Sequence, residues 1–155
     1  MKPNLGINES SLQIVADELN KILADEILLY FQTRNYHWNI EGQNFNQLHS
    51  FYDVQYNELD EIMDQTAERI RVIGHYSEAR LSDCIRFTNL IEPVFSNQQS
   101  EQLQQLLASH ETVIRNLRRL IPVFNDSYQD IGTADFLTQL LTRHEAMAWK
   151  IRAFF

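Results

Sequence analysis

The chain has 155 residues, of which 44% are hydrophobic, and 21 acidic against 13 basic residues give it a formal charge of −8. This length and apolar content fit one domain over residues 1–155, and the negative charge disfavours binding to a phosphate backbone. The single cysteine, Cys84, excludes an intrachain disulfide framework and a cysteine-based zinc module, and we expect it to be a buried hydrophobe. The chain has no apolar run of signal-peptide or membrane-spanning length, so we expect a cytoplasmic protein without membrane contact.

Apolar residues recur every three or four positions between the glycines of the chain, a pattern typical of helices. The first helix is predicted to begin after a Ser or Asn cap in residues 8–10 and to end before Gly42. The second is predicted to begin at residues 44–46 and to run to Gly74. These two segments account for nearly half of the chain.

The second half of the chain begins with a long connection. We predict a short helix over residues 84–87, capped by Ser82 followed by Asp83. A third long helix is predicted over residues 100–124, where Pro122 should kink or terminate it.

The fourth long helix is predicted from Thr133 to the C-terminus, with Trp149 as a core anchor. A long connection with a small helix between the second and third long helices favours a ferritin-like bundle over a simple up-and-down bundle. We therefore predict an all-α, ferritin-like four-helix bundle with a short extra helix in the connection between helices two and three.

Two pairs of metal-type ligands, His49 with Asp53 and Asp64 with Glu68, lie along the second predicted helix, and His37 precedes it. At about 100° per residue, the four helix positions fall within an arc of roughly 100°. His49 and Asp64 are separated by roughly 22 Å along the axis, far beyond the roughly 2 Å of a metal–ligand bond. The missing half must come from another helix, most economically the same helix of an antiparallel, two-fold related subunit.

These residues resemble the ferroxidase signature of the Dps-type mini-ferritins, the DNA-protection proteins of starved bacteria. The resemblance is carried by His37 followed by Trp38, by His49 and Asp53, and by DQTAERIRVIG with Asp64 and Glu68. The late segment DIGTADFLTQLLTRHEAMAWKIRAFF also resembles the final helix of that family and its lead-in. The resemblance implies a hollow homododecamer in which one subunit provides the two histidines and Asp53, and its partner provides Asp64 and Glu68.

The implied activity is that of a ferroxidase that oxidises Fe(II), preferentially with hydrogen peroxide, and stores ferric mineral, which protects the cell from oxidative damage. Carboxylates with imidazoles suit Fe(II), although Zn(II), Mn(II) and Co(II) compete for the same ligands. Trp38, beside a proposed ligand, is either a core anchor or a residue that quenches stray oxidising equivalents.

Other acidic residues have both an ordinary and a functional interpretation. The turn before the last helix contains three aspartates, Asp126, Asp130 and Asp135. They serve turn and helix-end chemistry, or they line the cation pore that the resemblance implies. The candidates for mineral nucleation, equally explained as an exposed helix face, are Glu58, Asp60 and Glu61.

Three alternative functions remain to be compared. A di-iron site inside one bundle would need Glu-x-x-His pairs, and no histidine has Glu three residues before it. The main rival is DNA binding and compaction through a lysine-rich tail. The first twenty residues contain a single lysine, Lys2, so we expect no useful DNA binding. A third possibility is a helical assembly without redox activity.

Overall fold

The computed structural model describes residues 3–155, so Lys2 lies outside the described residues. Within them the chain is all-helical, which confirms the predicted fold class. The elements are α1 (Glu9–Asn39), α2 (Phe45–Val72), α3 (Leu81–Phe87), α4 (Gln99–Pro122), the π-helical turn η1 (Val123–Ser127) and α5 (Ile131–Arg152).

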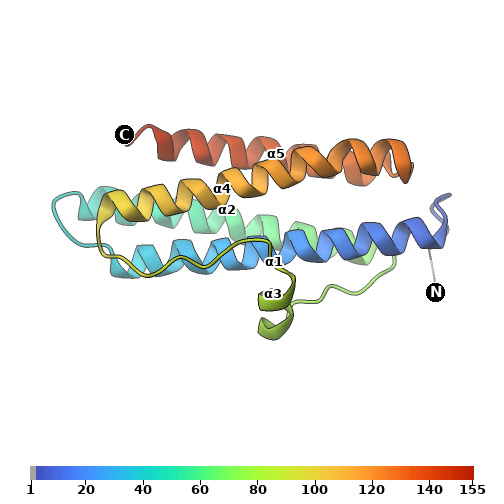
Figure 1. The fold of residues 1–155 in the computed structure, drawn as a ribbon, viewed down its shortest axis with the longest axis horizontal. Helices are drawn as coiled ribbons and strands as arrows, with labels where there is room; N and C mark the ends of the chain where they lie inside the picture. The colour runs from blue at the N-terminus through green and yellow to red at the C-terminus, as the bar shows by residue number, and fades with distance from the viewer. Residues whose placement is uncertain (1–2) are drawn as a thin grey trace.

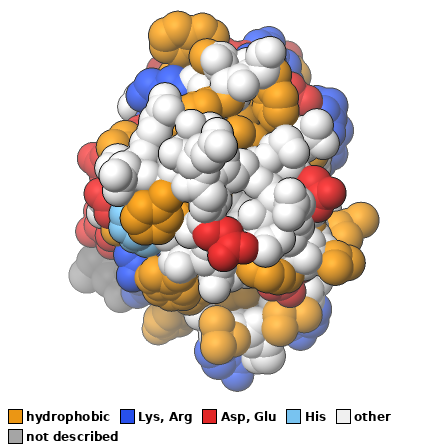
Figure 2. Space-filling view, turned by 90° about the vertical axis from the view of Figure 1, so that its left-hand side faces the viewer, with side chains coloured by type: hydrophobic (Ala, Val, Ile, Leu, Met, Phe, Trp, Pro, Cys, Tyr) orange, Lys and Arg blue, Asp and Glu red, His pale blue; other side chains and the backbone are white. Residues whose placement is uncertain are grey.

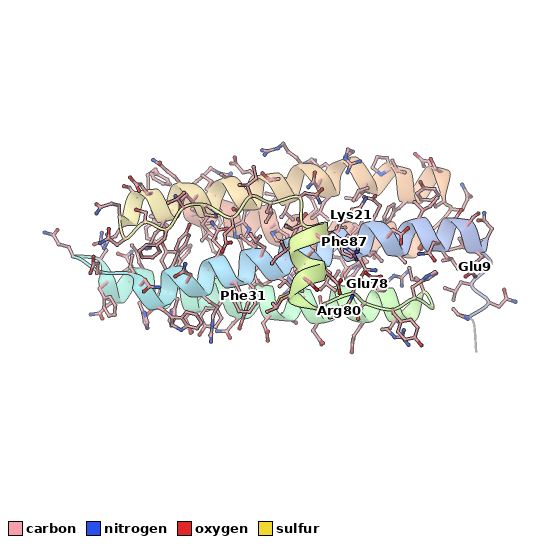
Figure 3. All side chains as sticks on the ribbon, turned by 60° about the horizontal axis from the view of Figure 1, so that its bottom comes forward. Glu9, Lys21, Phe31, Glu78, Arg80 and Phe87 are labelled. Atoms are coloured by element: carbon pink, nitrogen blue, oxygen red, sulfur yellow. The ribbon has the colours of Figure 1, made fainter. Side chains whose placement is uncertain are left out.

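The four long helices form two antiparallel hairpins, α1 with α2 and α4 with α5, which pack against each other (Figure 1). The connection between the hairpins runs the length of the bundle, because α2 ends at the opposite end from the start of α4 (Figure 1). Within this connection α3 crosses the outside of α1 between Lys21 and Phe31 (Figure 3). This long crossover is the predicted feature that distinguishes the fold from an up-and-down bundle.

The observed helix ends agree only in part with the predicted ones. Asn8 caps α1, because its side chain accepts a hydrogen bond from the Ser11 amide at 2.8 Å. The predicted cap of the short helix at Ser82 and Asp83 is wrong: α3 begins at Leu81 after Arg80, with no side-chain cap. The Asp83 carboxylate instead accepts from the Arg80 guanidinium at 2.6 and 2.9 Å, so it is already occupied.

Pro122 ends α4 as predicted, because its ring nitrogen cannot continue the helical hydrogen bonds. The chain widens into η1, where the Tyr128 amide donates to the Val123 carbonyl at 3.3 Å. The last helix begins two residues earlier than predicted, because the Asp130 carboxylate caps it by accepting from the Thr133 amide at 2.9 Å. Asp130 is thereby buried at the start of α5.

The core lies between the hairpins and is built from the apolar stripes of all four long helices, with Cys84 buried at its edge. The prediction that Trp149 is a core anchor is wrong for the single chain, because 64% of its surface is exposed. Its neighbours Met147, Ala148 and Ile151 occupy the core-facing positions of α5 instead. Across residues 3–155, no helix combines the length and the apolar character that crossing a bilayer requires.

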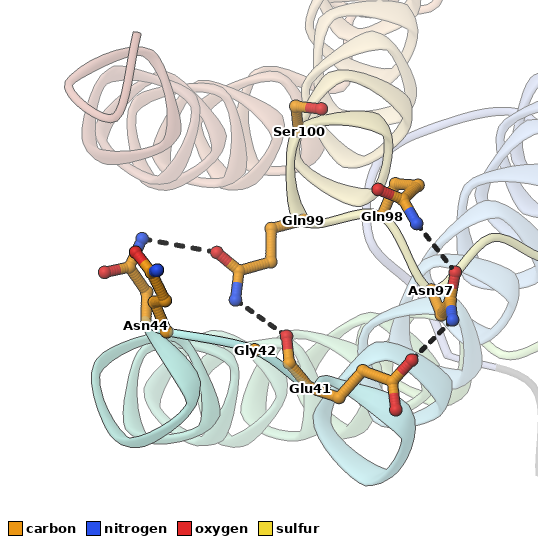
Figure 4. Close-up of a pocket in the computed structure, with 8 residues that line it drawn as sticks. Glu41, Gly42, Asn44, Asn97, Gln98, Gln99 and Ser100 are labelled. Atoms are coloured by element: carbon orange, nitrogen blue, oxygen red, sulfur yellow. Dashed lines mark hydrogen bonds between the residues drawn. The ribbon is translucent and has the colours of Figure 1, made fainter.

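Hydrogen bonds between amide side chains that line a pocket join the two hairpins at one end of the bundle (Figure 4). Gln99 of α4 donates to the Glu41 carbonyl at 2.7 Å and accepts from the Asn44 side chain at 3.2 Å. Gly42 adopts φ +101°, and a Cβ there would lie only 3.1 Å from the Gln99 amide nitrogen. The turn between α1 and α2 is therefore held in place beside the start of α4.

Candidate metal centre

The end of α1 and the start of α2 bring His37 and His49 face to face. The Nδ1 atom of His37 lies 2.9 Å from the His49 carbonyl, and Nδ1 of His49 lies 2.8 Å from the His37 carbonyl. The two rings stack with their centroids 3.7 Å apart. Because a carbonyl oxygen only accepts, both Nδ1 atoms carry the proton, and both Nε2 atoms keep a lone pair for a metal ion.

This histidine pair is half-buried, at the end of the bundle that carries the α1–α2 turn. Figure 2 looks at that end and shows histidine surface bordered by hydrophobic side chains. Backbone groups thus satisfy only one nitrogen of each ring. The other nitrogen of each ring has no protein partner among the described residues.

Asp53 lies one helical turn after His49 and is half-buried. Its Oδ1 atom accepts a hydrogen bond from the Tyr56 hydroxyl, and its Oδ2 atom lies 3.4 Å from the Asn57 amide nitrogen. The Tyr56 ring also meets the His37 ring edge-on, with centroids 5.2 Å apart. Tyr56 therefore positions two candidate ligands at once. Sequence analysis missed it, although its i+3 spacing from Asp53 on one helix was a usable signal.

Arg34 and three aromatic rings form the outer wall of this half-site. The guanidinium carbon lies 4.3 Å from the ring centre of Tyr56, 5.0 Å from that of Trp38 and 5.7 Å from that of Tyr30. Stacking of a guanidinium on aromatic faces holds the wall together. The interpretation of Trp38 as a core anchor is wrong for the single chain, because 60% of its surface is exposed.

Asp64 and Glu68 do not join the histidines within one chain. Helix α2 is continuous from Phe45 to Val72, so both acids lie several turns farther along it, away from the histidines. Over residues 3–155 no three His, Cys, Asp or Glu side chains come together as a metal-binding group. A single chain therefore presents two separate sets of ligands, and their union across two subunits stays a prediction.

The structure also sorts the secondary acidic candidates. Arg143 of α5 binds Glu58 at 2.5 Å and Glu61 at 2.7 Å, so these two carboxylates share one guanidinium as their ion-pair partner. Asp60 between them is exposed. Among the three aspartates near the last helix, Asp130 is buried as a cap, whereas Asp126 and Asp135 are exposed.

Comparison with known proteins adds an independent line of support. The family model of the ferritin-like domain matches residues 16–155. An uncharacterised low temperature-induced protein of Nostoc sp. is 37% identical over 97% of this chain and 85% of its own length. DNA protection during starvation protein 2 of Bacillus anthracis is 28% identical over 90% of this chain and 95% of that protein.

Solved structures show the same arrangement of helices. The Dps protein from Vibrio cholerae, described as a member of the ferritin-like diiron-carboxylate proteins, matches with a TM-score of 0.92 at 26% identity, over 99% of this chain and 97% of that one. A Dps protein from Bacillus brevis matches with a TM-score of 0.89 at 28% identity, over 96% and 99% of the two chains.

Proposed function

This chain belongs to the Dps family of ferritin-like proteins, a family of iron storage and DNA protection, and from that premise we propose that it is a ferroxidase. It oxidises Fe(II), preferentially with hydrogen peroxide, at dinuclear sites shared between two-fold related subunits. It stores the ferric product inside a hollow homododecamer in the cytoplasm and so limits oxidative damage.

One observation carries this proposal: both Nδ1 protons of the histidine pair are committed to backbone carbonyls, at 2.9 and 2.8 Å. Each ring is thereby held in the tautomer that a metal ligand requires. Asp53 adds a carboxylate whose position is supported by Tyr56. Imidazole nitrogen and carboxylate oxygen together are a donor set that suits Fe(II).

The second half of each proposed site is the pair Asp64 and Glu68 of a partner. When two α2 helices run antiparallel about a two-fold axis, the N-terminal ligands of one chain meet the C-terminal ligands of the other. Neither acid is fully buried in the single chain, so both are accessible to such a neighbour. Together with Asp53, the two additional carboxylates would offset most of the charge of two Fe(II) ions.

Pairing the two Fe(II) ions makes the proposed reaction protective. Each ion supplies one electron, and two electrons with two protons reduce one hydrogen peroxide molecule to two water molecules. A lone Fe(II) ion would supply only one electron and release a hydroxyl radical. The ferric ions then move to the interior and mineralise, with exposed Asp60 as a candidate nucleation residue.

DNA binding and compaction is the alternative that the names of several relatives bring forward. The charge of −8 opposes it. Helix α4 carries a cluster of three arginines at positions 115, 118 and 119. Arg118 pairs with Glu145, and Arg115 donates to Thr112 of its own helix, as is usual on an exposed helix face. A gel-shift assay at moderate salt tests this alternative, and retention of duplex DNA by the purified protein would favour it.

The experiment that tests the proposal is an anaerobic Fe(II) titration of the assembled protein, followed by addition of peroxide or of dioxygen. We expect two Fe(II) ions per site and faster oxidation by peroxide. His37→Ala, Asp64→Ala and Glu68→Ala should each slow the reaction by at least about tenfold. The matched control is His75→Ala, in the turn after α2, which should leave it unchanged.

Complementation tests whether the sites are shared. One variant carries His37→Ala with Asp53→Ala, and the other carries Asp64→Ala with Glu68→Ala. After the two inactive proteins are refolded together, random pairing should restore roughly a quarter of the sites, because each mixed dimer regains one intact site and loses one. A refolded mixture with no more activity than either variant alone would contradict a shared site. Normal oxidation rates in all the single variants would favour the alternative of a helical assembly without redox activity.

A further inference from the structure

A chain of three polar side chains crosses the core of the bundle, away from the candidate metal centre. Glu26 comes from α1, His110 from α4 and His144 from α5, and all three are completely buried. His144 Nε2 lies 2.9 Å from Glu26 Oε1, and His144 Nδ1 lies 3.1 Å from His110 Nδ1. We call these three residues the buried triad.

The geometry of the buried triad limits how many protons it holds. The contact between the two Nδ1 atoms admits a single hydrogen, because one nitrogen must donate while the other accepts. A further proton on His110 either sets two N–H groups against each other at this contact or sits on Nε2, which has no hydrogen-bond partner in the packed core. Either position makes His110 a buried imidazolium, which is unfavourable.

Nothing around the buried triad compensates an added charge. Glu26 Oε2 and His110 Nε2 are buried and have no hydrogen-bond partner among the described residues. The buried residues of α2 carry no charge, and those of α4 and α5 carry none apart from the two histidines. On α1 the remaining buried acid, Asp25, is bound to Thr88 and Asn89 of the crossover.

Nearby ionisable groups point elsewhere. Arg143, next to His144 in the chain, binds Glu58 and Glu61 on the surface of α2. The buried phenols are Tyr36, which bonds to Gln105, and Tyr52, whose hydroxyl lies 3.4 Å from a Gln102 oxygen. Apart from Glu26 itself, which contacts His144, no ionisable group among the described residues is therefore placed to offset a positive charge on His110.

We propose that the buried triad is an acid-sensitive lock in the core of the bundle, closed while it holds one shared proton between its histidines and opened when His110 is protonated. The histidine contact joins α4 to α5 within one hairpin, and the Glu26–His144 contact joins that hairpin to α1. Opening the histidine contact therefore loosens the packing of α4 against α5 in the core. This role is independent of the proposed iron chemistry.

The direction of the pH dependence follows from His110. Burial, and then the neighbouring His144, hold the pKa of His110 well below its ordinary value of 6.5. Below about pH 6.5, His110 therefore binds a proton in the unfolded chain but not in the folded chain. The stability is fully present above about pH 6.5 and is lost as the pH falls below it, with up to a tenfold drop in the folded-to-unfolded ratio per pH unit.

The test compares the wild-type protein with His110→Gln, whose amide can donate to His144 Nδ1 but cannot titrate. Unfolding by guanidinium is followed at one protein concentration between about pH 7.5 and pH 5. As the pH falls, we expect the folded-to-unfolded ratio of the wild-type protein to drop by up to about tenfold more per pH unit than that of His110→Gln. His75→Gln, a histidine outside both sites, should keep the wild-type slope.

Equal slopes for the wild type and His110→Gln would overturn the proposal, and so would an equal flattening by His75→Gln. If His110→Gln fails to fold, exchange of the histidine C2 proton in the wild-type protein, read by mass spectrometry, decides. His110 titrating below His75 in that measurement supports the lock. His110 titrating at or above His75 refutes it.

Discussion

This bundle contains two histidine pairs, and the comparison between them shows how one residue type acquires two chemistries. His37 and His49 lie half-buried at the end of the bundle and donate both Nδ1 protons to backbone carbonyls. His110 and His144 lie completely buried in the middle, with their Nδ1 atoms facing each other at 3.1 Å. The first pair keeps the lone pair of each Nε2 atom available for a metal ion, whereas in the second pair the two Nδ1 atoms contact each other.

The lesson lies in the hydrogen-bond partner rather than in the spacing of the rings. A carbonyl partner determines the tautomer and leaves the other nitrogen available for a metal ion. A second imidazole as partner leaves the tautomer open and makes the proton count critical. Burial adds to the difference, because desolvation of the completely buried His110 ring disfavours its charged form and lowers its pKa. Substitutions of residues that contact one pair, and of residues that contact neither, can separate these chemistries by experiment.

Glu26→Ala should cause the largest loss of stability. It removes the acceptor of His144 Nε2 and leaves that nitrogen unpaired in the core. Breaking a buried pair costs about 3 to 5 kcal/mol, which guanidinium unfolding will show. The matched control is Glu18→Ala on the same helix, whose partly exposed pair with Lys21 is worth under about 1 kcal/mol. Similar losses for the two variants would mean that the buried triad contributes nothing special.

Asp130→Ala should have an intermediate effect on stability and none on chemistry. It removes the cap of α5 and the partner of Arg69, and loss of such a cap costs about 1 to 2 kcal/mol. Asp135→Ala, an exposed position one turn on, is the control and should change the unfolding midpoint little. Because neither histidine pair is touched, we expect unchanged Fe(II) oxidation. Slower oxidation by Asp130→Ala would contradict a role as a cap alone and would favour the pore role that the resemblance implies.

Tyr56→Phe should affect the first histidine pair without destabilising the fold. It removes the hydroxyl that supports Asp53 and keeps the ring beside His37. Loss of such a supporting group weakens metal binding or activity by about 10-fold, measurable by anaerobic Fe(II) titration. Tyr30→Phe, on the outer wall, is the control. Wild-type affinity in Tyr56→Phe would show that Asp53 needs no support from this hydroxyl.

Trp38→Phe should have the smallest effect on binding and stability, because the indole is largely exposed. If Trp38 quenches stray oxidising equivalents, the variant binds iron normally but accumulates more radical damage during iron loading with peroxide. Peptide mass spectrometry after loading measures that damage. Trp149→Phe, also largely exposed on α5, is the control, and equal damage in both variants and the wild type would remove this role.

Much of the fold was predictable because helical periodicity is local. The apolar spacing located all four long helices, and Pro122 marked the end of α4 because its chemistry acts on its own turn. The failures were side chains whose environment is set by other residues. Arg80 occupies the Asp83 carboxylate that was expected to cap α3, and Trp149 lies on the outward face of α5.

Of the candidate centre, only the positions of the proposed ligands along the helices could be compared with the prediction. The order His49, Asp53, Asp64 and Glu68 along one helix decides which ligands share a face and which lie too far apart to meet. The stacking of Arg34 was missed because it depends on rings from two helices, whereas Tyr56 could have been found from its i+3 spacing to Asp53. The buried triad was invisible for a stronger reason: residues 26, 110 and 144 come from three different helices.

The amino-acid sequence was therefore enough to locate the helices, the crossover between them and the ligand positions along α2, because each depends on neighbours within a few turns. Only the packed bundle specifies which nitrogen of each histidine is free. That choice depends on the register of α1 against α2 and of α4 against α5. A shift of one helical turn would give each ring nitrogen a different hydrogen-bond partner, such as water in place of a carbonyl or an imidazole.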